Sequence, residues 1–91
     1  MTKKITLKSG NKATLINMSV DVFDQCMDAV TIETKIVDGK EETVVKNQFS
    51  LSTMWIRNGC KEGNDKFIKS LSIQDRTELQ IAIQEYNGLG E

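Results

Sequence analysis

The sequence predicts an α+β domain, and three observations support that prediction. Apolar and polar residues alternate on both sides of Ser9-Gly10-Asn11, which is typical of a β-hairpin. The stretch 31–45 is rich in β-branched residues and contains the turn signal Asp38-Gly39. The last third of the chain carries helical stripes that follow capping residues. With 91 residues and 5% aromatic residues, we expect a single small domain, 1–91, with a mostly aliphatic core.

The N-terminal β-hairpin is best closed by a three-residue loop, 9–11. This loop places Ile5 opposite Leu15 and Leu7 opposite Ala13, so that one face of the hairpin is apolar. A two-residue loop would mix apolar and polar residues on both faces. The last residue of the loop, an asparagine, is expected to adopt the left-handed conformation that asparagine tolerates well.

A helix is expected after the first hairpin, with Ser19 as its N-cap. Its stripe toward the core is predicted to comprise Val20, Phe23, Met27 and Val30. The β-branched stretch 31–45 then predicts a second strand pair. The sequence leaves open whether its polar tip, 38–42, is instead a mobile loop.

A C-terminal cluster of three helices is predicted for the rest of the chain. Ser50 is expected to cap the first of them, and Asn58-Gly59 to close it. This helix carries the apolar residues Leu51, Met54 and Trp55. A short second helix presents Phe67, Ile68 and Leu71 on its apolar side.

The last helix is predicted to start at Ser72, which with Asp75 resembles a capping box. Its core stripe comprises Leu79, Ala82, Ile83 and Tyr86. Ile73 and Ile81 fall off this stripe, so Ile81 widens the apolar surface of the helix. The tail, 88–91, is expected to be flexible.

The residue types argue against catalysis and against a metal or cofactor site. The chain has no histidine, so a Ser-His or Cys-His catalytic pair cannot form. The carboxylate pairs are interpreted as solvated; they are Asp21 with Asp24 and Glu41 with Glu42. Cys26 and Cys60 form neither a CxxC pair nor a disulfide framework, and are expected to be buried thiols. No glycine-rich phosphate loop is present. We therefore expect a protein that is not an enzyme and carries no cofactor or metal.

The charge balance argues against binding to nucleic acid, because 12 Lys and Arg residues stand against 13 Asp and Glu residues. No segment approaches the roughly 20 apolar residues of a membrane-spanning helix. We expect a cytoplasmic protein whose partners are other proteins.

Four residues are candidates for partner binding: Trp55, Arg57, Ile81 and Leu89. Tryptophan and arginine are common in interface hot spots, and the apolar Ile81 and Leu89 would gain from burial against another chain. The alternatives are that Trp55 is the largest core side chain, and that Arg57 belongs to a structural ion pair. So small a domain gains stability from a partner, and the sequence leaves a homo-oligomer open.

The order of these features resembles the small tail assembly chaperones of long-tailed bacteriophages. Leu7-Lys8-Ser9-Gly10 resembles the turn of the first strand pair in that family, and Leu71-Ser72-Ile73-Gln74-Asp75 resembles the start of its final helix. The resemblance covers both ends, roughly half of the chain. The β-branched stretch 31–48 departs from it, because the family is more helical there.

This resemblance implies a non-catalytic phage protein that binds tape-measure or tail-tube proteins in the cytoplasm of the infected cell. Two alternatives stay open: a small structural virion subunit of the baseplate or neck, and a phage-encoded inhibitor of a host defence enzyme. A DNA-binding regulator is disfavoured, because the last helix contains only one basic residue, Arg76.

Overall fold

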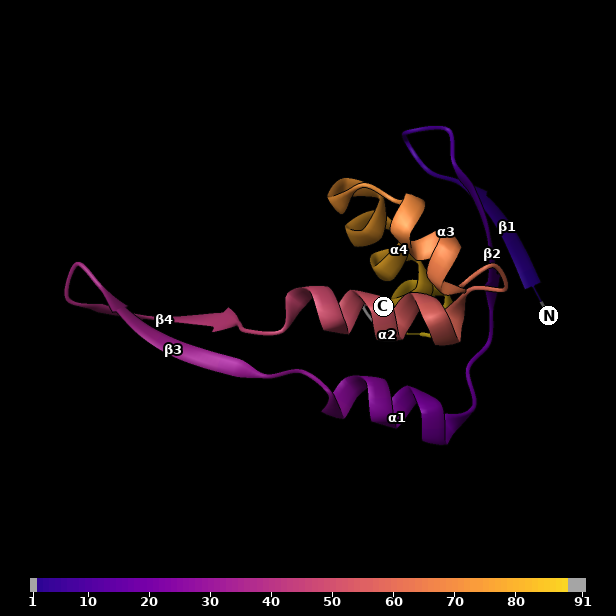
Figure 1. Cartoon of the computed structure of the whole chain (residues 1–91). Coiled ribbons are helices and arrows are strands. Elements are labelled where there is room, and N and C mark those ends of the chain that lie inside the picture. Colours follow the sequence, from indigo (N-terminus) through magenta and orange to yellow (C-terminus); the bar gives the residue numbers. More distant parts are fainter. Residues whose placement is uncertain (1, 89–91) are drawn as a thin grey trace.

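The computed structural model describes residues 2–88 and contains two antiparallel strand pairs and four helices (Figure 1). The elements are β1 Thr2–Thr6, β2 Lys12–Ile16, α1 Val20–Asp28, β3 Ile32–Val37, β4 Lys40–Val45, α2 Gln48–Gly59, α3 Asp65–Ser70 and α4 Ile73–Tyr86. The α+β prediction is confirmed, including the N-terminal hairpin and the C-terminal helices. Of the tail predicted to be flexible, 88–91, residues 89–91 lie outside the described residues.

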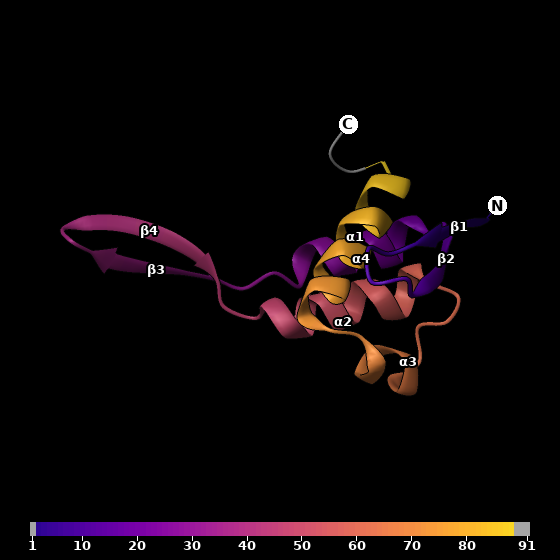
Figure 2. The ribbon, with the colours of Figure 1, turned by 90° about the horizontal axis from the view of Figure 1, so that it is seen from above.

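The hydrophobic core lies where β2, α1, α2 and α4 meet. Its largest fully buried side chains are Trp55, Leu15, Ile56, Leu79, Ile83 and Cys26. The β3–β4 hairpin stands away from this body in both views (Figure 1, Figure 2). The molecule is therefore elongated, with extents of 46 × 29 × 25 Å.

The predicted register of the first hairpin is wrong. Ile5 lies opposite Ala13 rather than opposite Leu15, so the strands are displaced by two residues. Because side chains alternate along a strand with a period of two, an even displacement keeps the same residues on the apolar face. Leu7, Ala13 and Leu15 are accordingly buried, and Ile5 packs against them from a partly exposed position.

The loop of this hairpin has three residues as predicted, but it lies one residue earlier in the chain, at 8–10, and it contacts α4. The Leu7 N–H donates to the Asn11 carbonyl at 2.7 Å, and the Gly10 N–H donates to the Leu7 carbonyl at 2.9 Å. The Ser9 hydroxyl and the Asn11 side-chain amide donate to the Asp75 carboxylate at 2.9 and 2.8 Å. Gly10, with φ of 96°, adopts the left-handed conformation that was predicted for Asn11.

Ser19 caps α1 as predicted, since its Oγ accepts the Val22 N–H at 3.3 Å. The predicted stripe is correct only for Phe23, which packs against the core. The other three of its residues are exposed: Val20, Met27 and Val30. The helix instead buries Cys26, with Val22 beside it. Val22 and Cys26 are four residues apart, so they form an alternative helical stripe of smaller side chains that fits against the body.

The second hairpin is confirmed. Ile32 lies opposite Val45 and Val37 lies opposite Lys40, so only Asp38 and Gly39 form the turn. Both turn residues have positive φ, 52° and 76°, as a two-residue hairpin turn requires. Residues 40–42, for which a mobile loop was left open, belong to β4.

The prediction that Ser50 caps α2 is wrong, because the helix already begins at Gln48. The preceding residue, Asn47, ties the start of α2 to the end of α1. Its side-chain amide donates to the Ala29 carbonyl at 2.7 Å, and its Oδ1 accepts the Thr31 N–H at 2.8 Å. The two chain segments that lead into and out of the second hairpin are thereby joined.

The restart at Ser72 is confirmed, since its Oγ accepts the Asp75 N–H at 3.1 Å. The capping box is only half formed, because the Asp75 carboxylate turns to the loop of the first hairpin instead of back to Ser72. The predicted core stripe of α4 is also confirmed: Leu79 and Ile83 are buried, and Ala82 and Tyr86 pack beside them.

Candidate functional site

Three of the four predicted partner-binding residues lie in the described part of the chain, and these three do not share one surface. Trp55 is 1% exposed and lies in the core, where its ring meets Phe23 edge-on with the ring centroids 5.6 Å apart. The alternative interpretation, in which Trp55 is the largest core side chain, agrees with this burial. Ile81 is 49% exposed on the outer face of α4. Leu89 lies outside the described residues.

Arg57 forms a structural ion pair, which was the alternative that the sequence left open for this residue. Its Nη2 lies 2.6 Å from Asp65 Oδ1, which links the end of α2 to the start of α3. This hydrogen bond and the adjacent positive charge hold the pKa of Asp65 below its usual value. Both side chains are exposed, so the pair contributes little to stability.

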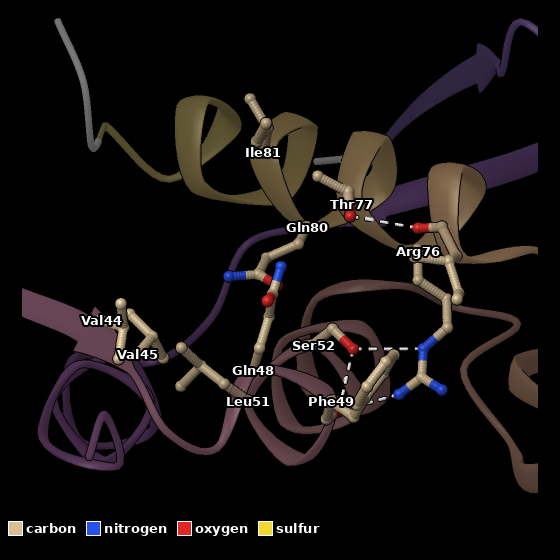
Figure 3. A pocket seen from close by; sticks show the side chains of 11 residues that line it. Val44, Val45, Gln48, Phe49, Leu51, Ser52, Arg76, Thr77, Gln80 and Ile81 are labelled. Carbon is tan, nitrogen blue, oxygen red and sulfur yellow. Dashed lines mark hydrogen bonds between the residues drawn. The ribbon is translucent and has the colours of Figure 1, made fainter. Parts of the chain in front are cut away.

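A concave surface, here called the α2–α4 groove, lies between the start of α2 and the outer face of α4, at the base of the second hairpin (Figure 3). Its volume is about 420 Å³. Its apolar lining comprises Val44, Val45, Phe49, Leu51, Ile73 and Ile81, and its polar lining comprises Gln48, Ser52, Arg76, Thr77 and Gln80.

The side of the groove on α4 follows from helical spacing. Ile73, Thr77 and Ile81 are each four residues apart, so they lie along one face of the helix. That face is separate from the core stripe, which explains why Ile73 is 60% exposed and Ile81 49% exposed. A second hollow, beside the loop of the first hairpin, is lined by the same three residues. The exposed face of α4 is therefore an apolar ridge between two concave surfaces.

The side of the groove on α2 is fixed by Arg76. Its Nε donates to Ser52 Oγ at 3.1 Å, and its Nη2 donates to the Phe49 carbonyl at 2.8 Å (Figure 3). The same Nη2 also donates to the Thr53 hydroxyl. Its guanidinium carbon lies 5.8 Å from the centroid of the Phe49 ring, within the range of a cation–π contact. Arg76 thus holds the first turn of α2 against α4, with the Phe49 ring still 58% exposed.

The groove carries a single positive charge. Arg76 is the only ionised residue among those that line it. Across residues 2–88 the one ion pair is that of Arg57 with Asp65, so no carboxylate of the described chain neutralises Arg76. The arrangement is an apolar surface with a guanidinium at its edge, and it suits an apolar segment that carries an acidic group.

Sequence reasoning missed most of this groove. It selected Ile81 because that residue falls off the core stripe, and the same signal was present at Ile73. It did not select Phe49, because the predicted helix began after it. The contribution of Val44 and Val45 depends on where the second hairpin joins α2, which no local pattern reports.

Metal-binding or thiol chemistry gains no support elsewhere in the chain. Within residues 2–88, no three Cys, Asp or Glu side chains gather as metal ligands do. Both cysteines are free and buried. Burial raises the pKa of Cys60 to about 11 and raises the pKa of Cys26 above its usual value, so both thiols are protonated near neutral pH.

The fold and the groove define a small α+β domain with an exposed apolar surface. Comparison with known proteins gives no relative: no protein-family model, no curated protein and no solved structure matches the chain. Among the helices of residues 2–88, none combines the length and the apolar character that crossing a membrane requires.

Proposed function

We propose that this chain is a non-catalytic protein-binding module, and that it holds an amphipathic segment of a partner protein in the α2–α4 groove. The observation that carries the proposal is the gathering of exposed apolar side chains around an unneutralised arginine. Phe49, Ile73 and Ile81 are each about half exposed or more, and Arg76 lies at the edge of the surface that they form. Exposed apolar surface of this kind is typical of interaction sites.

A helical segment fits the groove best. Ile73 and Ile81 are eight residues apart on α4, which corresponds to roughly 12 Å along the helix axis. A partner helix presents apolar side chains at about that interval, at positions i, i+4 and i+7. A carboxylate on the partner, or the carbonyl groups at the end of its helix, would lie favourably against the guanidinium of Arg76.

A narrower proposal rests on the resemblance to small tail assembly chaperones. In this proposal the partner is a tape-measure or tail-tube protein, and the chain acts in the cytoplasm of the infected cell. The apolar helices of a tape-measure protein have the chemistry that the groove would accept, and many weak contacts along such a protein would add up through multivalency.

The test replaces both isoleucines of the groove with lysine (Ile73→Lys with Ile81→Lys). Val20→Lys is the matched control, because Val20 is an exposed apolar residue of α1 outside the groove. The probes are synthetic helical segments of the tape-measure protein from the same genome, titrated into each variant by calorimetry. We expect the wild type and the control to bind equally, and the double variant to bind at least about tenfold more weakly.

Equal binding by the double variant would reject the groove as the binding site. If the wild type binds no segment of a tape-measure or tail-tube protein, the narrower proposal fails. Two further outcomes identify the alternatives. Presence of the chain in purified virions indicates a structural subunit, and loss of a co-purified host enzyme's activity indicates an inhibitor.

A further inference from the structure

We infer that two copies of this chain associate through the outer edge of β3, so that their second hairpins form one four-stranded antiparallel sheet. This inference does not rest on the proposed function. The sheet of β3 and β4 has only two strands, so both of its outer edges are unpaired within residues 2–88. The hairpin also stands clear of the rest of the molecule (Figure 1, Figure 2). An isolated two-stranded hairpin is marginally stable in water, and additional strands stabilise it.

The outer edge of β3 offers the backbone groups of its even-numbered residues. The Lys46 N–H donates to the Thr31 carbonyl at 2.7 Å, and the turn at residues 38–39 closes the opposite end of the ladder. Hydrogen-bonded residues alternate along an antiparallel strand, so the odd-numbered residues of β3 bond to β4. The N–H and C=O groups of Ile32, Thr34 and Ile36 therefore point to the outer edge.

The sequence of β3 is complementary to itself when reversed. It reads Ile32-Glu33-Thr34-Lys35-Ile36. Antiparallel pairing of two copies about Thr34 places Glu33 of each copy opposite Lys35 of the other. The same pairing places Ile32 opposite Ile36. Opposite charges in directly facing positions stabilise a strand pair, whereas like charges destabilise it.

The backbone and the charges select the same register. Pairing about Thr34 brings even-numbered residues together, as the outward backbone groups require. Shifting the centre by one residue would place Glu33 opposite Glu33 or Lys35 opposite Lys35. In the Thr34-centred register, Glu33 and Lys35 form non-hydrogen-bonded pairs, in which facing side chains are closest. The contact is also the same on both copies, so it closes as a dimer.

The edge of β4 is less complementary to itself than the edge of β3 is. Pairing two copies of β4 about Thr43 places Glu41 opposite Val45 and Glu42 opposite Val44. Centring on Glu41 brings Lys40 opposite Glu42 but places Glu41 opposite Glu41 of the second copy, and centring on Glu42 places Glu42 opposite Glu42. The charges therefore favour the β3 edge over the β4 edge.

The β3 pairing also covers apolar surface. Ile32, Thr34 and Ile36 lie on one face of the hairpin, because alternate residues of a strand share a face. Ile36 is 76% exposed and Ile32 is 58% exposed in the single chain. In the paired sheet, each isoleucine lies beside an isoleucine of the second copy, which removes part of that surface from water.

The experiment measures the oligomeric state of the full chain by sedimentation equilibrium. We expect the wild type to dimerise, and Glu33→Lys and Lys35→Glu each to weaken dimerisation by at least about tenfold, because each creates like-charge pairs across the edge. Glu41→Lys is the matched control. It changes the net charge as Glu33→Lys does, but it lies on β4, and dimerisation should persist.

Mixing the two weakened variants gives the decisive result. One variant carries lysine at both positions 33 and 35, and the other carries glutamate at both, so a mixed dimer regains two opposite-charge pairs. We expect the equimolar mixture to dimerise. The inference is overturned if the wild type is a monomer throughout, if both single variants dimerise like the wild type, or if the mixture stays monomeric.

Amide hydrogen exchange provides a second readout that needs no substitution. In the concentrated wild type, the amides of Ile32, Thr34 and Ile36 should exchange more slowly than in dilute protein. Fast exchange of these three amides at high concentration would also overturn the inference, even if the charge variants failed to fold. If the double variant Ile73→Lys with Ile81→Lys still dimerises, dimerisation through the β3 edge does not depend on the α2–α4 groove.

Discussion

Glu62 holds Thr14 with both oxygens of its carboxylate. One oxygen accepts the Thr14 N–H and the other accepts the Thr14 hydroxyl, each at 2.8 Å. The neighbouring Lys61 N–H donates to the Thr14 carbonyl at 2.9 Å, and Cys60 forms a β-bridge with Leu15. The segment after α2, residues 60–62, therefore covers the edge of β2.

The contact between Glu62 and Thr14 predicts a pH-dependent contribution to stability. Burial raises the pKa of Glu62, but the hydrogen bonds that Thr14 and Cys60 donate outweigh it, so the pKa lies below the ordinary value of 4.5. The ionised carboxylate therefore stabilises the fold fully above the pKa of the unfolded chain. That stabilisation is lost as the pH falls through the lower pKa of the folded chain.

We expect Glu62→Ala to reduce the free energy of unfolding by about 1 to 3 kcal/mol near neutral pH. The difference from the wild type should shrink in acid, where the carboxylate of the wild type becomes protonated. Urea unfolding of both proteins over a series of pH values measures this difference in the free energy of unfolding. Glu85→Ala, at an exposed position of α4, is the control, and a difference that does not vary with pH would contradict the prediction.

Substitutions of Trp55 and of Ile81 should differ in their effect on the free energy of unfolding. Trp55→Ala should lower the free energy of unfolding by about 3 to 5 kcal/mol, because the residue is fully buried and its ring packs edge-on against Phe23. Ile81→Lys should change it by no more than about 0.5 kcal/mol, because half of that side chain already meets solvent. Denaturant unfolding of the two variants, followed by circular dichroism, measures both values. Comparable losses would show that Ile81 also belongs to the core.

Gly59 is required where α2 meets α4. A methyl group there would overlap Ile83 Cγ2 and lie 2.7 Å from Met18 Cε. Alanine favours a helix over glycine by only about 0.5 to 1 kcal/mol, whereas overpacking costs about 1 to 3 kcal/mol. We therefore expect Gly59→Ala to lower the thermal unfolding midpoint.

Adding Ile83→Leu to that variant should recover part of the loss, because leucine carries no methyl branch at Cβ. Ile83→Leu alone is the control for the effect of the second change. If the effects of the two substitutions on the thermal unfolding midpoint are additive, the overlap with Ile83 is not the cause of the loss.

The buried thiols should react slowly in the native protein. The pKa of Cys60 is raised from 9.0 to about 11, mainly by burial, which lowers its thiolate fraction near neutral pH by about a hundredfold. Cys26 is also fully buried, and its pKa is raised in the same direction. A chromogenic disulfide reagent should label both cysteines quickly in denaturant and slowly without it. Rapid labelling of one cysteine in the native protein would show that its segment opens locally.

Local rules were enough to predict the elements of this fold. Ser19 and Ser72 accept the N–H groups expected of N-caps, because a cap involves only the adjacent turn of the helix. The turn at Asp38-Gly39 was predictable for the same reason. The core stripe of α4 followed from helical spacing alone.

The errors arose where distant contacts decide the geometry. In the first hairpin, whose register was predicted wrongly, the loop donates hydrogen bonds to Asp75, from a distant part of the sequence. The rotation of α1 depends on how Cys26 fits the body of the protein, and two stripes of that helix were apolar enough to compete. The groove depends on Arg76 joining the start of α2 to α4. None of these contacts leaves a periodic signal in the sequence.

The loop of the first hairpin also limits when the protein can finish folding during its synthesis. The Lys8 N–H donates to the Glu78 carboxylate at 3.1 Å, and Asp75 holds the same loop. The ribosome makes β1 and β2 before α4, so the loop between these strands cannot form its contacts with Asp75 and Glu78 until α4 has been made. The apolar face of the first hairpin therefore remains uncovered on the nascent chain until α4 has emerged from the ribosome, and only then can the core close.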